Sequence, residues 1–215
     1  RSAPNIFVDK SKVKSVFDLS SFTGATTISL FLSDLQMAMF PVWSNSLDTV
    51  FHPDTTILTN QSNVFIYYRI HANFHTLALN NTYVDGSIGT ILAFASAGTF
   101  NSDTTNRMLV SDLIREGITG AHGYAYSGYV GYYNERTLFD SYIKGFNLAE
   151  SYYSGNYLLS WQDVFIGDPK TSVRVDFASN VSDRNFMQVE LELYPNPTNS
   201  VVQIKSDVHV LALEV

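Results

Sequence analysis

Cysteine is absent from all 215 residues of this chain. The absence excludes disulfide bridges, thiolate metal sites and a cysteine nucleophile within the sequence. Charged residues are also scarce, at 15% of the total. Lys and Arg number 13 against 20 Asp and Glu, which leaves a net charge of −7. Because no cluster of Lys and Arg stands out against this negative charge, we expect no nucleic-acid partner.

Long apolar runs are missing as well. No stretch approaches the roughly 18 apolar residues that a membrane-spanning helix needs, so we do not expect an integral membrane protein. The opening Arg1-Ser2-Ala3-Pro4 lacks the apolar centre of a signal peptide. The chain also stops at Leu213-Glu214-Val215, within an apparent strand. We therefore expect it to be a piece of a longer polypeptide, with its N-terminus lost.

The hydrophobic content of 45% is enough for one large domain with a core. Runs of β-branched and aromatic residues predict buried strands, and one alternating run predicts a half-exposed strand. The buried strands are expected at 64–68, 90–95, 120–126 and 163–166, and the half-exposed one at 173–177. Residues 1–25 predict no element, and residues 45–63 predict a loop.

Apolar residues at helical spacing predict three helices. The first covers residues 28–39 and ends before Pro41. The second covers residues 108–116, with Gly117 as its C-terminal stop. The third begins with a capping-box pattern at Thr137 and continues to Tyr153 with Gly145 inside it. Buried strands separated by amphipathic helices predict an α/β fold, with a mostly parallel sheet covered by helices on both faces. Sites in such sheets form at the carboxyl ends of the strands.

The C-terminal residues predict a second, smaller part. Residues 179–190 are mostly polar and are expected to be a linker. Before it we expect an α/β domain at 1–178 that is incomplete at its N-terminus. After it, residues 191–215 are expected to form the start of a small β module. The motif Leu193-Tyr194-Pro195-Asn196-Pro197 opens this module, and two prolines around an asparagine exclude a helix or a central strand. Short alternating segments follow it.

This tail resembles the start of the C-terminal sorting domain of type IX secretion cargo in Bacteroidota. The resemblance implies a protein that crosses the periplasm and outer membrane to the cell surface or the medium. It also implies two partners, the type IX translocon and its outer-membrane shuttle. The alternative interpretation is an ordinary hairpin with a proline-rich turn.

A series of motifs in residues 91–169 carries a second resemblance. Its parts are Leu113–Gly120, Gly123–Tyr126, Leu138–Phe139, Tyr142–Gly145, Asn147–Tyr153, Leu159–Asp163 and Ile166–Pro169. In this order and spacing they resemble a family of secreted bacterial proteins that is distantly similar to caspase-like and gingipain-like cysteine peptidases. Gingipains are themselves type IX cargo, so the two resemblances agree. Together they imply a caspase-like α/β scaffold.

The peptidase mechanism needs a thiolate at the end of one buried strand and a histidine at the end of its neighbour. By resemblance, Ser96 occupies the nucleophile's place, and His71 lies where the histidine is expected. A serine hydroxyl is far less acidic than a thiol and needs a well-placed base. We therefore expect a non-catalytic protein with a role in binding, adhesion or assembly. The alternative is a peptidase-like hydrolase that uses Ser96 with His71 or His75. A further alternative places an enzyme domain before Arg1.

Three other features suggest contacts rather than catalysis. His71 and His75 have the H-x-x-x-H spacing of zinc ligands, but they follow a strand and no Glu adjoins the first histidine. Two hydrogen-bonded imidazoles are therefore favoured, and we expect no metal or cofactor. For His122 we favour a packing or turn role over a ligand contact. Tyr124 and Tyr126 suit carbohydrate or peptide binding, and covering the edge of the core is the equal alternative.

Overall fold

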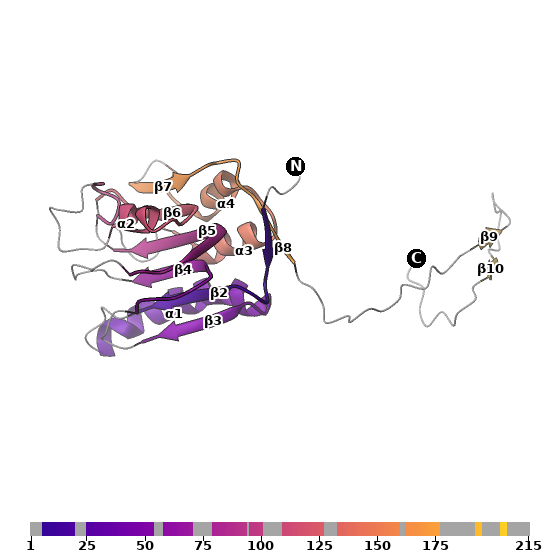
Figure 1. The fold of residues 1–215 in the computed structure, drawn as a ribbon, viewed down its shortest axis with the longest axis horizontal. Coiled ribbons are helices and arrows are strands. Elements are labelled where there is room, and N and C mark those ends of the chain that lie inside the picture. Colours follow the sequence, from indigo (N-terminus) through magenta and orange to yellow (C-terminus); the bar gives the residue numbers. More distant parts are fainter. Residues whose placement is uncertain are drawn as a thin grey trace. The chain divides into compact units, whose positions relative to one another are not determined.

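The computed structural model describes residues 6–19, 25–53, 58–70, 79–93, 95–100, 109–126, 133–159, 162–176, 192–194 and 203–205. By the contacts within the chain it divides into two compact units, Arg1–Phe177 and Ala178–Val215. The first unit is an α/β domain with a six-stranded, mostly parallel sheet, as predicted. Figure 1 shows its strands stacked from β7 at one edge to β3 at the other.

The strand order of this sheet is β3-β2-β4-β5-β6-β7. All neighbouring pairs are parallel except β6 and β7, which are antiparallel. The strands are β2 (Lys14–Asp18), β3 (Asp48–His52), β4 (Val64–Ile70), β5 (Tyr83–Leu92), β6 (Gly120–Tyr124) and β7 (Asp163–Gly167). The order is that of a doubly wound sheet, extended by one antiparallel edge strand.

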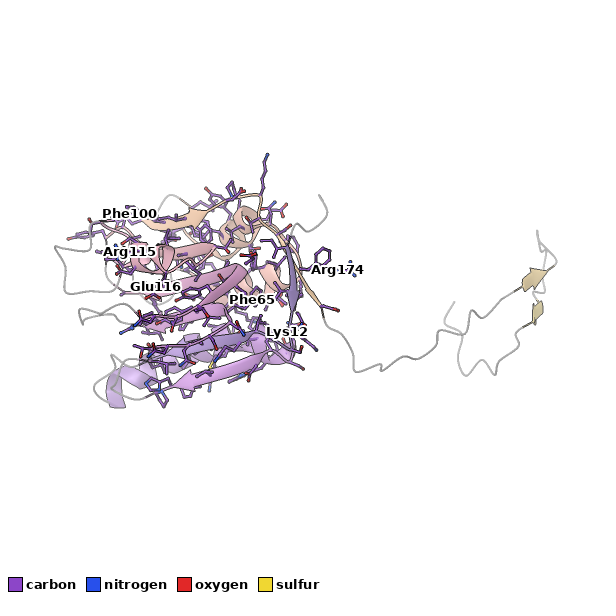
Figure 2. All side chains as sticks on the ribbon, in the orientation of Figure 1. Lys12, Phe65, Phe100, Arg115, Glu116 and Arg174 are labelled. Atoms are coloured by element: carbon purple, nitrogen blue, oxygen red, sulfur yellow. The ribbon has the colours of Figure 1, made fainter. Side chains whose placement is uncertain are left out.

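Helices cover both faces of the sheet. They are α1 (Ala25–Ser44), α2 (Val110–Arg115), α3 (Glu135–Ile143) and α4 (Leu148–Gly155). Buried side chains of α1, α3 and α4 form one core cluster with Phe65 and Tyr68 of β4. Phe65, labelled in Figure 2, lies in this cluster. Its ring stacks on that of Tyr142 of α3, with ring centroids 6.3 Å apart. Buried side chains of α2 form a second cluster with Val64 and Tyr67 of β4. Side chains of β4 therefore contribute to both cores, and a register shift between Val64 and Ile66 interrupts the regular alternation.

Two shorter strand pairs complete the described structure. In the first unit, β1 (Ile6–Asp9) pairs with β8 (Val173–Asp176) in parallel. Arg174, labelled in Figure 2, and Phe7 are both exposed on this pair. The Arg174 guanidinium lies 6.0 Å from the centroid of the Phe7 ring. In the second unit, β9 (Glu192–Tyr194) pairs with β10 (Gln203–Lys205) in antiparallel fashion. The predicted linker at 179–190 and the sorting module that starts at 191–215 stay predictions.

Several predicted boundaries are wrong, and the N-terminal half holds most of them. Pro41 lies inside α1 rather than beyond its end. Pro41 lacks the N–H that would bond the carbonyl oxygen one turn earlier, so α1 loses one hydrogen bond there. Its own carbonyl oxygen accepts the backbone and side-chain N–H groups of Asn45 at the helix end. Residues 1–25, which predicted no element, contain β1 and β2. Residues 45–63, predicted as a loop, contain the edge strand β3.

The predicted third helix is two helices. It does not begin with a capping box at Thr137, because the N-cap of α3 is Asn134, whose side chain accepts the Thr137 N–H. It does not continue to Tyr153, because Gly145 adopts a φ of +85° that ends the helical path. Asn147 then starts α4 with a capping box that Glu150 completes. By contrast, α2 and its stop at Gly117, with φ +96°, agree with the prediction.

The predicted strand at 120–126 ends at Tyr124, before its expected end. The strand at 163–166 was predicted to be buried, but β7 is half-exposed along its first four residues. The cause is its position at the edge of the sheet. The strand predicted at 173–177 alternates between buried and exposed residues in β8, as expected.

Candidate functional site at the carboxyl edge of the sheet

The strand order reverses between β2 and β4. From β2 the chain passes through α1 to β3 on one side, and then to β4 on the other side of β2. Ligands of open α/β sheets bind outside the carboxyl ends of the strands at such a switch point. In this domain that edge carries Asp18 at the end of β2 and Ile70 at the end of β4. It is the first place to look for a site.

A buried ion pair lies directly at the switch point. Asp18 and Arg69 face each other across the β2–β4 pair, and both side chains are fully buried. Arg69 Nη1 lies 3.4 Å from Asp18 Oδ2. Tyr67, two residues before Arg69 in β4, donates its hydroxyl to the same carboxylate oxygen at 3.4 Å. Burial raises the pKa of Tyr67 well above its usual value, so this phenol stays protonated and serves as a donor.

The sequence prediction missed this pair, although a signal was present. The run of β4 from Val64 to Ile70 is apolar and aromatic except for Arg69. An arginine inside a buried strand requires a carboxylate partner. Asp18 ends the short segment Lys14–Asp18, which has too few apolar residues to stand out as a strand. The chemistry was therefore readable, but the identity of the partner was not.

Ser96, the candidate nucleophile, is buried just after the end of β5. Its hydroxyl donates to the Ile91 carbonyl oxygen at 2.9 Å and accepts the Tyr124 backbone N–H at 3.1 Å. These bonds tie the end of β5 to the end of β6. Gly123 leaves room for the serine, because a Cβ atom at that position would lie 2.5 Å from Ser96 Oγ. In this arrangement the hydroxyl serves as a structural link.

The two candidate bases, His71 and His75, lie outside the described residues, in the segment that follows Ile70. Leu193 and Tyr194 of the predicted sorting motif lie in β9. Pro195, Asn196 and Pro197 lie outside the described residues. The structure therefore describes Ser96 without its proposed partners.

His122 lies in the middle of β6 and is fully buried among tyrosine rings. Its ring centroid is 4.1 Å from that of Tyr133 and 5.7 Å from that of Tyr152. Within the described part of the chain, neither ring nitrogen has a hydrogen-bond partner. Nε2 lies 3.9 Å from Asp163 Oδ1 on β7. Burial lowers the pKa of His122 and the nearby Asp163 carboxylate opposes this shift, so the imidazole is neutral at pH 7.

The other two candidate contact residues differ in exposure. Tyr124 is fully buried, and its ring centroid lies 5.2 Å from that of His122. Tyr126 is 62% exposed. The structure thus brings His122 and Tyr124 together in the core and leaves Tyr126 at the surface.

Three further observations bear on function. No group of three or more potential ligand side chains that could hold a metal ion occurs in the described ranges. Within the same ranges, no helix combines the length and apolar character that a membrane crossing requires. No family model, curated protein or solved structure matches the chain.

Proposed function

We propose that this protein is type IX cargo at the cell surface or in the medium, and that its α/β domain works by binding rather than by hydrolysis. The chain holds no cysteine that could act as a thiol nucleophile. The export half of this proposal rests on the resemblance of the tail, and the observation that carries the binding half is the environment of Ser96. A catalytic serine needs a base within hydrogen-bond reach and an open side toward the substrate. Ser96 is instead buried, and its proton is donated to the Ile91 carbonyl oxygen.

A serine-directed probe tests this proposal against the hydrolase alternative. The folded chain is incubated with a fluorophosphonate, and the modified residues are identified by mass spectrometry. We expect no modification of Ser96 in the folded state. Modification of Ser96 that is abolished in Ser96→Ala and blocked by a substitution of His71 or His75 would establish the hydrolase instead.

The stability of Ser96→Ala provides an independent readout. The substitution removes the partner of two buried backbone groups, the Ile91 carbonyl and the Tyr124 N–H, and should cost about 1–3 kcal/mol of unfolding free energy. Ser111→Ala is the matched control, because the Ser111 hydroxyl is buried without a hydrogen-bond partner among the described residues. We expect the control to be nearly neutral in urea denaturation. Equal effects of the two substitutions would count against a structural role for Ser96.

Export is tested separately in a bacterium that has the type IX system. The full chain is expressed behind a secretory signal peptide, with and without residues 191–215. We expect the longer form to reach the surface or medium and the shorter form to remain in the periplasm. Export of both forms, or export that survives loss of the translocon, would contradict the sorting hypothesis while leaving the result for Ser96 unaffected.

A further inference from the structure

A groove of about 440 Å³ lies between α4 and the edge strand β7. One face of α4 forms one wall, because the helical residues that line it follow the spacing i, i+3 and i+4. They are Ala149, Tyr152 and Tyr153, and the C-cap residue Asn156 continues the wall. The volume is in the range of ligand pockets in proteins. The groove is separate from the carboxyl edge of β2 and β4, where Asp18 and Arg69 lie.

The second wall of the groove is the edge of β7 rather than one of its faces. Asp163, Val164 and Phe165 all line the groove, and so does Gly167. Successive side chains of a strand point to opposite faces of a sheet, so a cavity on one face would be lined by alternate residues. Lining by three consecutive residues therefore places the groove along the edge. In the described sheet, β7 is the last strand and pairs only with β6 (Figure 1).

The hydrogen-bond pattern shows which backbone groups this edge offers. Ala125 donates its N–H to the Gln162 carbonyl oxygen at 2.7 Å, one step beyond the pair Tyr124–Asp163. In an antiparallel pair, positions whose backbone groups face the partner alternate with positions whose groups point away. The backbone N–H and C=O groups of Val164 and Ile166 consequently point toward β6.

The N–H and C=O groups of Asp163, Phe165 and Gly167 point away from β6, and all three residues line the groove. Their outward groups make no backbone hydrogen bond to another described residue. Unpaired edge groups of this kind are a template for an added strand. Both carboxylate oxygens of Asp163 are also buried without a hydrogen bond in the described part of the chain.

The chemistry of the walls indicates the occupant. Tyr153, which is 59% exposed, and the half-buried Phe165 offer aromatic surface, whereas Tyr152 is buried. Among the described residues that line the groove, Asp163 is the one acidic residue, with its side chain 1% exposed, and none is Lys or Arg. The chain as a whole carries a net charge of −7, which disfavours an acidic partner. An extended peptide fits both walls, because its backbone can pair with the edge while alternate side chains enter between strand and helix.

We propose that the groove between α4 and β7 binds an extended, neutral or basic peptide segment as a further strand of the sheet. This inference rests on the proposed binding function and gives it a ligand class. Residues of the partner with apolar or aromatic side chains pack against Tyr153 and Phe165. Main-chain hydrogen bonds to Phe165 and Gly167 hold the segment in register.

Synthetic heptapeptides test the proposal on the full chain. The probes alternate threonine with valine or phenylalanine, are blocked at both ends, and carry a lysine at each end. Binding is followed by fluorescence anisotropy. With probe at about ten times its Kd, the amide exchange of Phe165 and Gly167 should slow about tenfold. The amides of Val164 and Ile166, which already face β6, should change little.

Three controls separate strand addition from other modes of binding. Probes methylated on alternate backbone nitrogens lose the donors of one edge and should not bind. Glutamate-ended probes should bind more weakly than lysine-ended ones. Tyr153→Ala should weaken binding about fivefold or more. Tyr157→Ala should not, because Tyr157 is similarly exposed, at 61%, but does not line the groove.

The proposal is overturned if no lysine-ended probe binds below about 1 mM. It is also overturned if methylated probes bind as well as unmodified ones, or if Tyr153→Ala binds like the parent chain. A dimer in light scattering that protects the same amides and excludes the probes would make a second copy the occupant. Each of these outcomes leaves the Ser96 labelling result intact, so the failure of this inference is distinguishable from the failure of the proposed function.

Discussion

Replacing Asp18 by Asn should be among the most destabilising conservative changes in this domain. The substitution keeps the size of the side chain and an oxygen acceptor for Tyr67, but it leaves the fully buried Arg69 without its carboxylate. At the observed separation of 3.4 Å, the attraction between unit charges is about 5 kcal/mol for an effective dielectric constant of about 20. Measured losses on removing one partner of a buried pair are about 3–5 kcal/mol.

For a domain of this size, that loss corresponds to a fall in Tm of about 6–20 °C. Urea denaturation followed by tyrosine fluorescence and circular dichroism measures it directly. The matched control is Asp140→Asn, which removes a shorter but exposed pair with Lys144 at 2.7 Å. The two residues of that pair are four positions apart at the end of α3. Loss of the pair should lower the free energy of unfolding by only about 0.3–0.5 kcal/mol. Burial, rather than distance, should therefore decide the cost.

The double substitution Asp18→Leu with Arg69→Met completes the test. Removing both charges removes the desolvation cost together with the attraction, so the double variant should recover most of the lost stability. If Asp18→Asn lowers stability by less than about 1 kcal/mol, the pair is not the buried, mutually dependent unit described above. If the double variant is as unstable as the single one, packing at these positions is the cause and the electrostatic reasoning is refuted.

The remaining predictions concern three other positions. Because burial lowers the pKa of His122, the unfolded chain binds a proton that the folded chain does not as the pH falls below about 6.5. The free energy of unfolding should therefore fall toward acid pH, with a contribution from His122 of up to about 1.4 kcal/mol per pH unit. In denaturant titrations, the stability of His122→Gln should depend less steeply on pH than that of the parent chain. An equally steep pH dependence in the two proteins would refute this. Gly123→Ala places a Cβ atom 2.6 Å from Val110 Cγ2 and also against Ser96. In urea denaturation it should lower the free energy of unfolding by about 1–3 kcal/mol. An unchanged midpoint would show that the ends of β5 and β6 can move apart to make room. Asn147→Ala removes the acceptor of the Glu150 N–H at 2.9 Å and should cost about 1 kcal/mol, while Asn147→Ser should restore most of it in thermal melts.

Local patterns were sufficient to predict the fold class and the core of β4. The strand predicted at 90–95 matches only the end of β5, which runs from Tyr83 to Leu92. The segment Val64–Ile70 is buried at every position, and a nearly continuous apolar and aromatic run identifies such a strand. The neighbouring β2 was missed because two of its five residues, Ser15 and Asp18, are polar and yet fully buried. The burial of Asp18 depends on Arg69, which lies far along the chain. No window around β2 contains that information.

The division between α3 and α4 was missed for a different reason. Apolar residues continue at helical spacing on both sides of Gly145, so periodicity alone predicts one helix. The two helices are separated by the positive φ of Gly145 and by the cap at Asn147. Both are local signals, but a glycine within a helical pattern can be tolerated as well as terminate it. The choice between these outcomes is made by tertiary packing.

For the candidate site, the sequence located Ser96 after the β5 strand but could not determine its environment. The serine is buried because Gly123 and Tyr124 of β6 lie against it. That arrangement depends on the pairing of β5 with β6, whose residues are about thirty positions apart. The sequence thus predicts that Ser96 follows a buried strand, but it does not predict that the serine is buried.

Two polar groups at the carboxyl edge, those of Asp18 and Ser96, have a common property that bears on binding. The Asp18 carboxylate is paired with Arg69, and the Ser96 hydroxyl bonds to backbone groups. A ligand that engaged any of these groups would first have to break an internal contact of the domain, at a cost comparable to the contact itself. The outward backbone groups of Phe165 require no such exchange, because they have no backbone partner among the described residues. For equal contacts with a ligand, the edge of β7 therefore retains more of the interaction energy than the buried groups at the carboxyl edge.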